Sequence, residues 1–119
     1  MFQFIKKKYK IKKTQAMLVL TNIDMYPGPG WTFVFGVTML SAHLSIISVA
    51  RHCPSFFNES PSNTDQQMFR ALKTTCHELS HLFGMRHCVY FECLMNGSNL
   101  IEEADRKPLR MCPVCIKKL

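Results

Sequence analysis

The sequence predicts a small α/β (α+β) domain, in which a small mixed sheet packs on one long helix and an irregular C-terminal part follows. Three observations carry this prediction: β-branched and aromatic runs in the first half, one long run with helical spacing, and four clustered cysteines near the C-terminus. A chain of 119 residues has room for a single core, and 47% hydrophobic residues is typical of a folded globular protein.

The first fifteen residues are the most basic part of the chain. The formal net charge is +7, and six lysines lie among the first thirteen residues. We expect residues 1–15 to form a basic flexible tail and residues 16–119 to form one domain. Because the remainder is nearly neutral, the charge predicts no nucleic-acid partner.

The apolar runs of the chain are short. Residues 16–20 are too few for a secretory signal, and residues 44–50 fall short of the roughly 18 needed to cross a bilayer. We therefore expect no signal peptide and no membrane partner, and an intracellular protein, cytoplasmic or nuclear. In such a compartment the 6 cysteines favour metal binding over disulfides.

Three strands and one long helix are expected in chain order. The strands are predicted over residues 16–23, 31–37 and 44–51, with Pro and Gly alternating at 27–30 to turn the chain between the first two. Residues 53–64 predict a loop that offers a helix cap at Ser62, Asn63 or Thr64. A helix over residues 65–83 follows from apolar residues spaced by three and four, at Met68, Leu72, Cys76, Leu79 and Phe83.

The predicted helix carries the motif HExxHxxGxxH. His77 and His81 lie one turn apart on one face and suit a zinc ion, while Leu72, Leu79 and Phe83 are expected to pack on the opposite face. Gly84 ends the helix and permits the turn that brings His87 back as a third ligand. Glu78 is then the candidate general base, taking the proton of a zinc-activated water that attacks a peptide bond. The motif predicts a zinc metallopeptidase.

Four cysteines form a second cluster after the helix. Cys88 and Cys93 are followed by the pair Cys112 and Cys115, which has the CxxC spacing of a structural zinc site. We expect a second, structural zinc ion here, with two disulfides as the alternative. The other two cysteines, Cys53 and Cys76, are expected to be small buried apolar side chains.

The run HELSHLFGMRHC at residues 77–88, followed by Cys93-Leu94-Met95 and Cys112-Pro113-Val114-Cys115, resembles the archaemetzincins. The resemblance covers about residues 16–118. It implies a metzincin-like catalytic domain with two zinc ions, a Met-turn at Met95 beneath the active site, and aminopeptidase-like cleavage of small peptides. It also implies an edge strand that holds extended peptide, for which residues 44–51 are our candidate.

Two departures from the family pattern leave alternatives open. Family domains generally begin well before the first strand expected here, so N-terminal elements are expected to be missing, and Ser80 stands where the family usually has glycine. One alternative is therefore a truncated, non-catalytic zinc protein that binds peptide or a protein partner. Another is a zinc-ribbon module that binds nucleic acid through its lysines. The favoured partner is a peptide or small protein substrate. The sequence does not indicate how many chains assemble.

Overall fold

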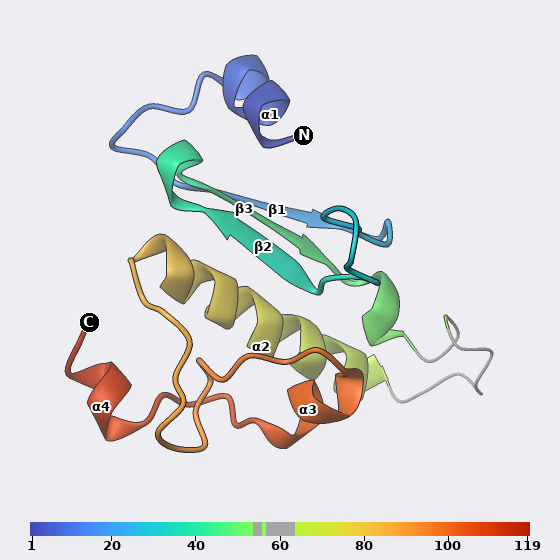
Figure 1. Cartoon of the computed structure of the whole chain (residues 1–119), viewed down its shortest axis with the longest axis vertical. Helices are drawn as coiled ribbons and strands as arrows, with labels where there is room; N and C mark the ends of the chain where they lie inside the picture. Colours follow the sequence, from blue (N-terminus) through green and yellow to red (C-terminus); the bar gives the residue numbers. More distant parts are fainter. Residues whose placement is uncertain (54–55, 57–63) are drawn as a thin grey trace.

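A computed structural model describes residues 1–53, 56 and 64–119. Most of the loop predicted at 53–64, with the candidate caps Ser62 and Asn63, lies outside the described residues. Figure 1 shows helix α1 on one side of a three-stranded sheet and helix α2 on the other, with the C-terminal segment next to α2. In chain order the elements are α1 (Phe2–Tyr9), β1 (Met17–Thr21), β2 (Gly36–Met39), η1 (Leu40–Ala42), β3 (Leu44–Ser48), η2 (Ala50–His52), α2 (Thr64–Leu82), α3 (Ile101–Arg106) and α4 (Pro113–Ile116).

The sheet is mixed, as predicted, but its order corrects one assignment. The strand order is β1-β3-β2, with β1 parallel to β3 and β2 antiparallel to it. We expected residues 44–51 to form the edge strand, whereas β3 is the central strand and has neighbours on both sides. All five of its residues are buried because α1 and α2 cover its two faces. The two edges of the sheet are β1 and β2.

The second strand starts later than predicted. We expected it over residues 31–37, whereas β2 begins at Gly36 and only an isolated bridge joins Met25 to Val34 before it. The aromatic residues ahead of β2 serve side-chain packing: the guanidinium of Arg51 stacks 3.9 Å above the ring of Phe33. The aromatic residues before β2 therefore belong to a loop that packs through its side chains. Their high β propensity led to a strand prediction that starts too early.

The basic N-terminal segment differs from the expected flexible tail. Residues 2–9 form α1, and Phe2 and Ile5 pack against the buried cluster that contains Leu44 and Ile46. The ammonium group of Lys6 also donates a hydrogen bond of 2.8 Å to the carbonyl oxygen of Ser41. The apolar residues recur one helical turn apart among the lysines, so one side of the helix packs on the sheet while the charges stay solvated.

The long helix is confirmed at Thr64–Leu82, but its faces are reversed. We expected Leu72, Leu79 and Phe83 to pack, yet they are 44%, 37% and 77% exposed. Polar residues of the helix are buried in their place, and hydrogen bonds offset the cost of this burial. The ammonium group of the buried Lys73, for example, donates hydrogen bonds to the carbonyl oxygens of Ala104, Asp105 and Lys107. The helix therefore turns its polar side toward the sheet and the C-terminal segment.

Three smaller points complete the fold. Ser80 is buried and donates a hydrogen bond of 2.7 Å to the carbonyl oxygen of Cys76 one turn earlier, so its hydroxyl is satisfied within the helix. Cys53 and Cys76 are half-buried, not buried as expected. Among the described residues, no helix has the length and apolar character required to cross a membrane.

Candidate active site

Three histidines converge at the C-terminal end of α2. His77 and His81 lie on the helix, and the chain reverses at Gly84, whose φ of 86° is in the left-handed region that favours glycine. This reversal brings back His87, so that the Nε2 atom of His77 lies 3.1 Å from that of His81 and 3.3 Å from that of His87. The structure thus brings together all three residues that the motif indicated.

Hydrogen bonds to the Nδ1 atoms of His77 and His81 fix the orientation of the two imidazole rings. The Nδ1 of His77 lies 2.8 Å from the carbonyl oxygen of Leu94, and the Nδ1 of His81 lies 2.6 Å from that of Met85. A carbonyl oxygen only accepts, so each Nδ1 carries the proton and each Nε2 carries a bare lone pair.

Bare lone pairs at this distance repel one another unless a cation lies between them. A tetrahedral zinc ion with bonds of about 2.0 to 2.1 Å would hold its ligand nitrogens about 3.3 Å apart, close to the separations found here. The donor set and its spacing therefore fit a zinc ion.

The protonation state of the histidines points the same way. Burial lowers the pKa of His77 to about 3, and the positive charge of Lys107 adds to this effect. Burial also lowers the pKa of His87. These imidazoles stay neutral at physiological pH, which is the form that coordinates a metal.

Glu78 lies beside the histidines with its carboxylate held from the sheet. Its Oε2 accepts a hydrogen bond of 2.6 Å from the hydroxyl of Thr38, which in turn lies 2.8 Å from the hydroxyl of Ser45. Thr38 and Ser45 are paired on β2 and β3. Burial raises the pKa of Glu78, and the hydrogen bond from Thr38 opposes this shift. The carboxylate is thereby held in one position beside the histidines.

Gly36 gives Glu78 the room it needs. A Cβ atom at Gly36 would lie 2.6 Å from both Cγ and Oε1 of Glu78, which is closer than atoms can approach. If Glu78 is the general base that the motif predicts, Gly36→Ala is expected to displace its carboxylate and to lower peptide cleavage about a hundredfold, because small misplacements of a catalytic group have effects of this size. Cleavage by the purified variant, with its zinc content as the folding control, measures this; cleavage at the unmodified rate would show that this contact does not matter.

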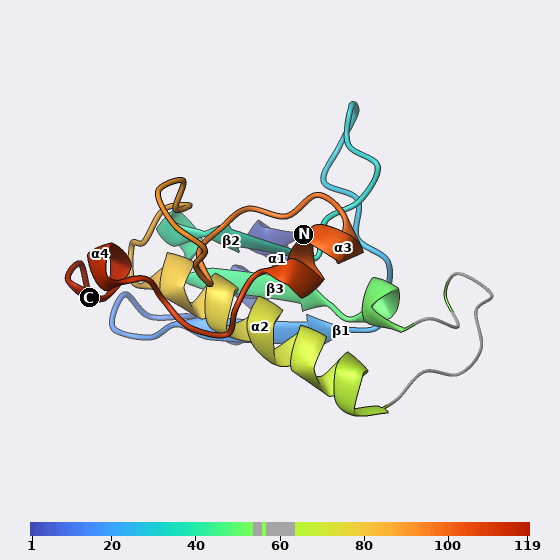
Figure 2. The ribbon, with the colours of Figure 1, turned by 90° about the horizontal axis from the view of Figure 1, so that it is seen from below.

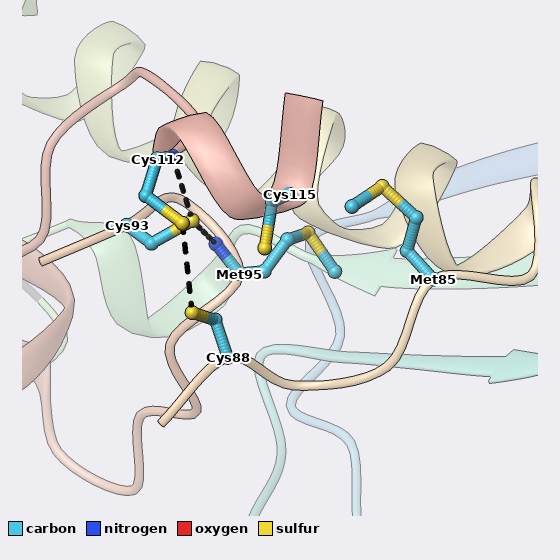
Figure 3. Packing of buried hydrophobic residues seen from close by; sticks show 6 residues of the cluster. All are labelled: Met85, Cys88, Cys93, Met95, Cys112 and Cys115. Atoms are coloured by element: carbon cyan, nitrogen blue, oxygen red, sulfur yellow. Dashed lines mark hydrogen bonds between the residues drawn. The ribbon is translucent and has the colours of Figure 1, made fainter. Parts of the chain in front are cut away.

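The four cysteines meet in a second cluster, formed by Cys88, Cys93, Cys112 and Cys115. All four are buried and free, and the sulfur atoms of Cys88 and Cys112 are 3.8 Å apart, far beyond a disulfide bond (Figure 3). Zinc bonded to sulfur at about 2.3 Å would separate its ligands by about 3.8 Å. Backbone N–H groups of Met95 and Cys112 point to the sulfur of Cys93, as they do toward a thiolate.

The thiol pKa values also require a cation at this cluster if all four sulfurs are to ionise. Backbone hydrogen bonds lower the pKa of Cys88 to about 7, whereas burial and the neighbouring thiols raise that of Cys115 to about 12. Ionising one thiol therefore hinders the next unless a metal compensates the charge. The cluster fits a closed tetrathiolate site.

Met95 connects the two clusters. It is fully buried against the cysteines and Met85, between which Figure 3 shows its side chain. Its backbone oxygen accepts a hydrogen bond of 2.8 Å from the N–H of Cys88, the residue after the third histidine. The position of His87 is therefore tied to the cysteine cluster through the backbone.

Two cavities flank the histidines along β2. The larger, about 730 Å³, is lined by His77, Glu78 and His87 together with aromatic residues before β2 and the segment that leads to α3. The smaller, about 500 Å³, is lined by β2, Glu78, His81 and His87. Figure 2 shows the segment before α3 on the β2 side of α2, where the larger cavity lies. An extended peptide bound in these cavities would lie next to the histidines and run along the edge strand β2.

A helix bearing HExxH, a third histidine beyond a glycine turn and a cleft beside an open sheet edge together define the architecture of the zinc metallopeptidases. The model of Peptidase family M54 matches residues 4–119. The chain belongs to this family, the family of the archaemetzincins.

Relatives in several organisms share this pattern. The chain is 38% identical to archaemetzincin-2 of Homo sapiens over 98% of its own length and 39% of the relative, and 36% identical to the archaemetzincin of Pyrococcus horikoshii over 98% and 59%. It thus spans about two fifths of the length of archaemetzincin-2.

Solved structures agree with the fold. A zinc-dependent peptidase from Methanocorpusculum labreanum superposes with a TM-score of 0.82 at 28% identity, covering 97% of this chain and 59% of that one. The archaemetzincin of Archaeoglobus fulgidus, solved in complex with malonate, superposes with a TM-score of 0.72 at 30% identity, covering 88% and 61%. The metzincin-like fold expected from the resemblance is confirmed.

Four residues that shape this site are not indicated by any motif in the sequence. Thr38, Ser45 and Gly36 lie on strands, and Lys107 lines the larger cavity from the segment after α3. A polar residue within an apolar strand, such as Ser45 in Leu44–Ser48, is the one signal that could have indicated a partner on α2.

Proposed function

We propose that this chain is a zinc metallopeptidase that uses Glu78 as its general base. The observation that carries the proposal is the hydrogen-bonded carboxylate of Glu78, buried beside three imidazoles whose lone pairs converge, at a cleft along β2. A zinc site alone has no need of a carboxylate held in this way.

Each side chain has a separate role in the proposed reaction. His77, His81 and His87 would hold a zinc ion, which supplies Lewis acidity and lowers the pKa of a water molecule. Glu78 accepts a proton from the attacking water and delivers it to the leaving amine. Thr38 keeps the carboxylate in place and, by lowering its pKa, keeps it able to accept that proton.

The edge strand β2 is the proposed support for the substrate. Its residues Gly36–Met39 pair with β3 on one side, and both cavities lie along β2. An extended peptide would add to this edge through backbone hydrogen bonds, which select for extended backbone more than for particular side chains. We therefore expect a peptide or small protein substrate, held by β2 instead of residues 44–51.

The second cluster is proposed to hold a structural zinc ion through Cys88, Cys93, Cys112 and Cys115. Its ligands leave no open position, as is typical of structural sites. Because Cys88 directly follows His87, ordering the cysteines fixes the third histidine. The proposed total is two zinc ions, one catalytic and one structural.

Zinc removal and return test the proposed function. Purified chain treated with a chelator is expected to lose cleavage of a mixed peptide library, and added zinc is expected to restore it. Comparing free with N-acetylated peptides tests the aminopeptidase-like preference suggested by the family resemblance. A non-catalytic zinc protein, the alternative, would bind peptide but leave every sequence in the library intact.

A further inference from the structure

A buried lysine lines the larger cavity and is not used by the proposed reaction. Lys107 is 9% exposed and shares this cavity with His77, Glu78 and His87. Burial lowers its pKa to about 8, so its ammonium group remains largely protonated at neutral pH. A buried charge is costly unless it is paired or hydrogen-bonded, which makes its partners informative.

The ammonium group of Lys107 has N–H donors that are not used within the described part of the chain. Its Nζ donates a hydrogen bond of 3.2 Å to the carbonyl oxygen of Asn96, and in the described part of the chain it has no other hydrogen bond and no ion pair. An ammonium group has three N–H donors. The other buried lysine, Lys73, shows the contrast: it reaches three carbonyl oxygens at 2.6, 3.0 and 3.2 Å and is fully used in joining α2 to the segment around α3.

The carboxylates that share the cavity do not take up these donors. The carboxylate of Glu78 accepts its hydrogen bond from Thr38, and it acts on Lys107 only through its charge, without a hydrogen bond. Glu103 accepts hydrogen bonds of 2.6 and 3.3 Å from the backbone N–H groups of Asn99 and Leu100, which offset its charge. An ammonium group with free donors therefore lines a cavity next to the proposed reaction centre.

We propose that Lys107 is a specificity-determining residue, which binds a carboxylate group of the peptide in the larger cavity. This inference rests on the proposed function for its location but concerns substrate binding alone. The carboxylate could be the side chain of an aspartate or glutamate, or the free C-terminus of a short peptide. Both present two oxygens to an ammonium group, and Trp31 and Phe33, which line the same cavity, would cover the apolar part of the ligand.

Peptide binding without cleavage tests this inference. Zinc-loaded Glu78→Gln chain is titrated with matched peptides in two pairs: a C-terminal acid against its amide, and an internal Glu against Gln with the C-terminus amidated. Within at least one pair, the peptide that carries the carboxylate is expected to bind roughly 10- to 100-fold more tightly than its amide. This is the gain in affinity that a hydrogen bond to a charged group typically provides. The pair that shows the difference identifies the source of the carboxylate.

Three variants in the same background make the test specific to Lys107. Lys107→Met is expected to reduce the preference to about twofold or less, Lys107→Arg to retain it, and the matched control Lys13→Met, at an exposed lysine, to leave it unchanged. No preference in the Glu78→Gln chain itself, or an equal preference in Lys107→Met, would overturn the inference. Because cleavage is not measured, a Lys107-dependent preference would stand even if the chain hydrolysed no peptide, so the two proposals can fail separately.

Discussion

Replacing Glu78 with Gln is expected to lower peptide cleavage by about 10²- to 10⁴-fold, the range over which a positioned general base contributes. The amide can still accept the hydrogen bond from Thr38 through its oxygen, so the local packing is retained. It cannot accept and return a proton at neutral pH. Zinc content should therefore stay unchanged while the rate constant for cleavage falls.

The matched control for this variant is Glu102→Gln. Glu102 is exposed on α3 and lies outside both cavities, so the same chemical change there should leave cleavage as it is. Unchanged cleavage in Glu78→Gln would remove the basis of the proposed mechanism. Loss of zinc in that variant would instead show that the carboxylate supports the metal site and not only proton transfer.

Replacing Cys112 with Ser is expected to remove the structural metal and to destabilise the C-terminal segment by several kcal/mol. Structural zinc sites contribute apparent binding free energies of roughly 10 to 16 kcal/mol in small domains, and losing one of four thiolates forfeits a large part of this. The hydrophobic cluster around Cys112 consists mainly of cysteine and methionine side chains, so it has few other contacts to compensate.

Thermal unfolding followed by circular dichroism measures this effect. Cys76→Ser is the matched control, because Cys76 is half-buried on α2 and lies outside the metal cluster. The melting temperature of Cys112→Ser should fall well below that of Cys76→Ser, and cleavage should fall with it because Cys88 and His87 are adjacent. Equal melting temperatures would mean that the cysteines do not hold a stabilising metal.

The sequence predicted the parts of the site whose spacing is set by local geometry. His77 and His81 are one turn apart on any helix, and CxxC brings two sulfurs together over a short backbone path, so local spacing alone indicates each pair. Gly84 likewise had to allow a backbone reversal, and its positive φ shows that it does. Such motifs need no knowledge of the rest of the fold.

Contacts between distant segments could not be predicted in the same way. Thr38 meets Glu78 across 40 residues because β2 packs on α2, and neither segment encodes that pairing in its own spacing. Helix periodicity also misled the assignment of faces: the apolar stripe that includes Leu72 and Leu79 is largely exposed. Burial here follows hydrogen-bond partners on the sheet and the C-terminal segment, which apolar patterning does not report.

The position of β3 in the sheet was predicted wrongly for a related reason. A strand buried on both faces, such as Leu44–Ser48, can be expected at an edge or at the centre of a sheet, because its residue pattern reports burial of the side chains and not pairing of the backbone. The helix at Phe2–Tyr9 was missed since its lysines dominate the composition, although Phe2 and Ile5 already had helical spacing.

The zinc content of the folded chain, measured by native mass spectrometry, tests most directly whether the chain carries two metal ions at two different sites. The chain is expected to carry two zinc ions, with one lost in His81→Ala and one lost in Cys112→Ser. One zinc ion, lost only in Cys112→Ser, would mean that the three histidines hold no metal and would contradict the proposal that this chain is a metallopeptidase.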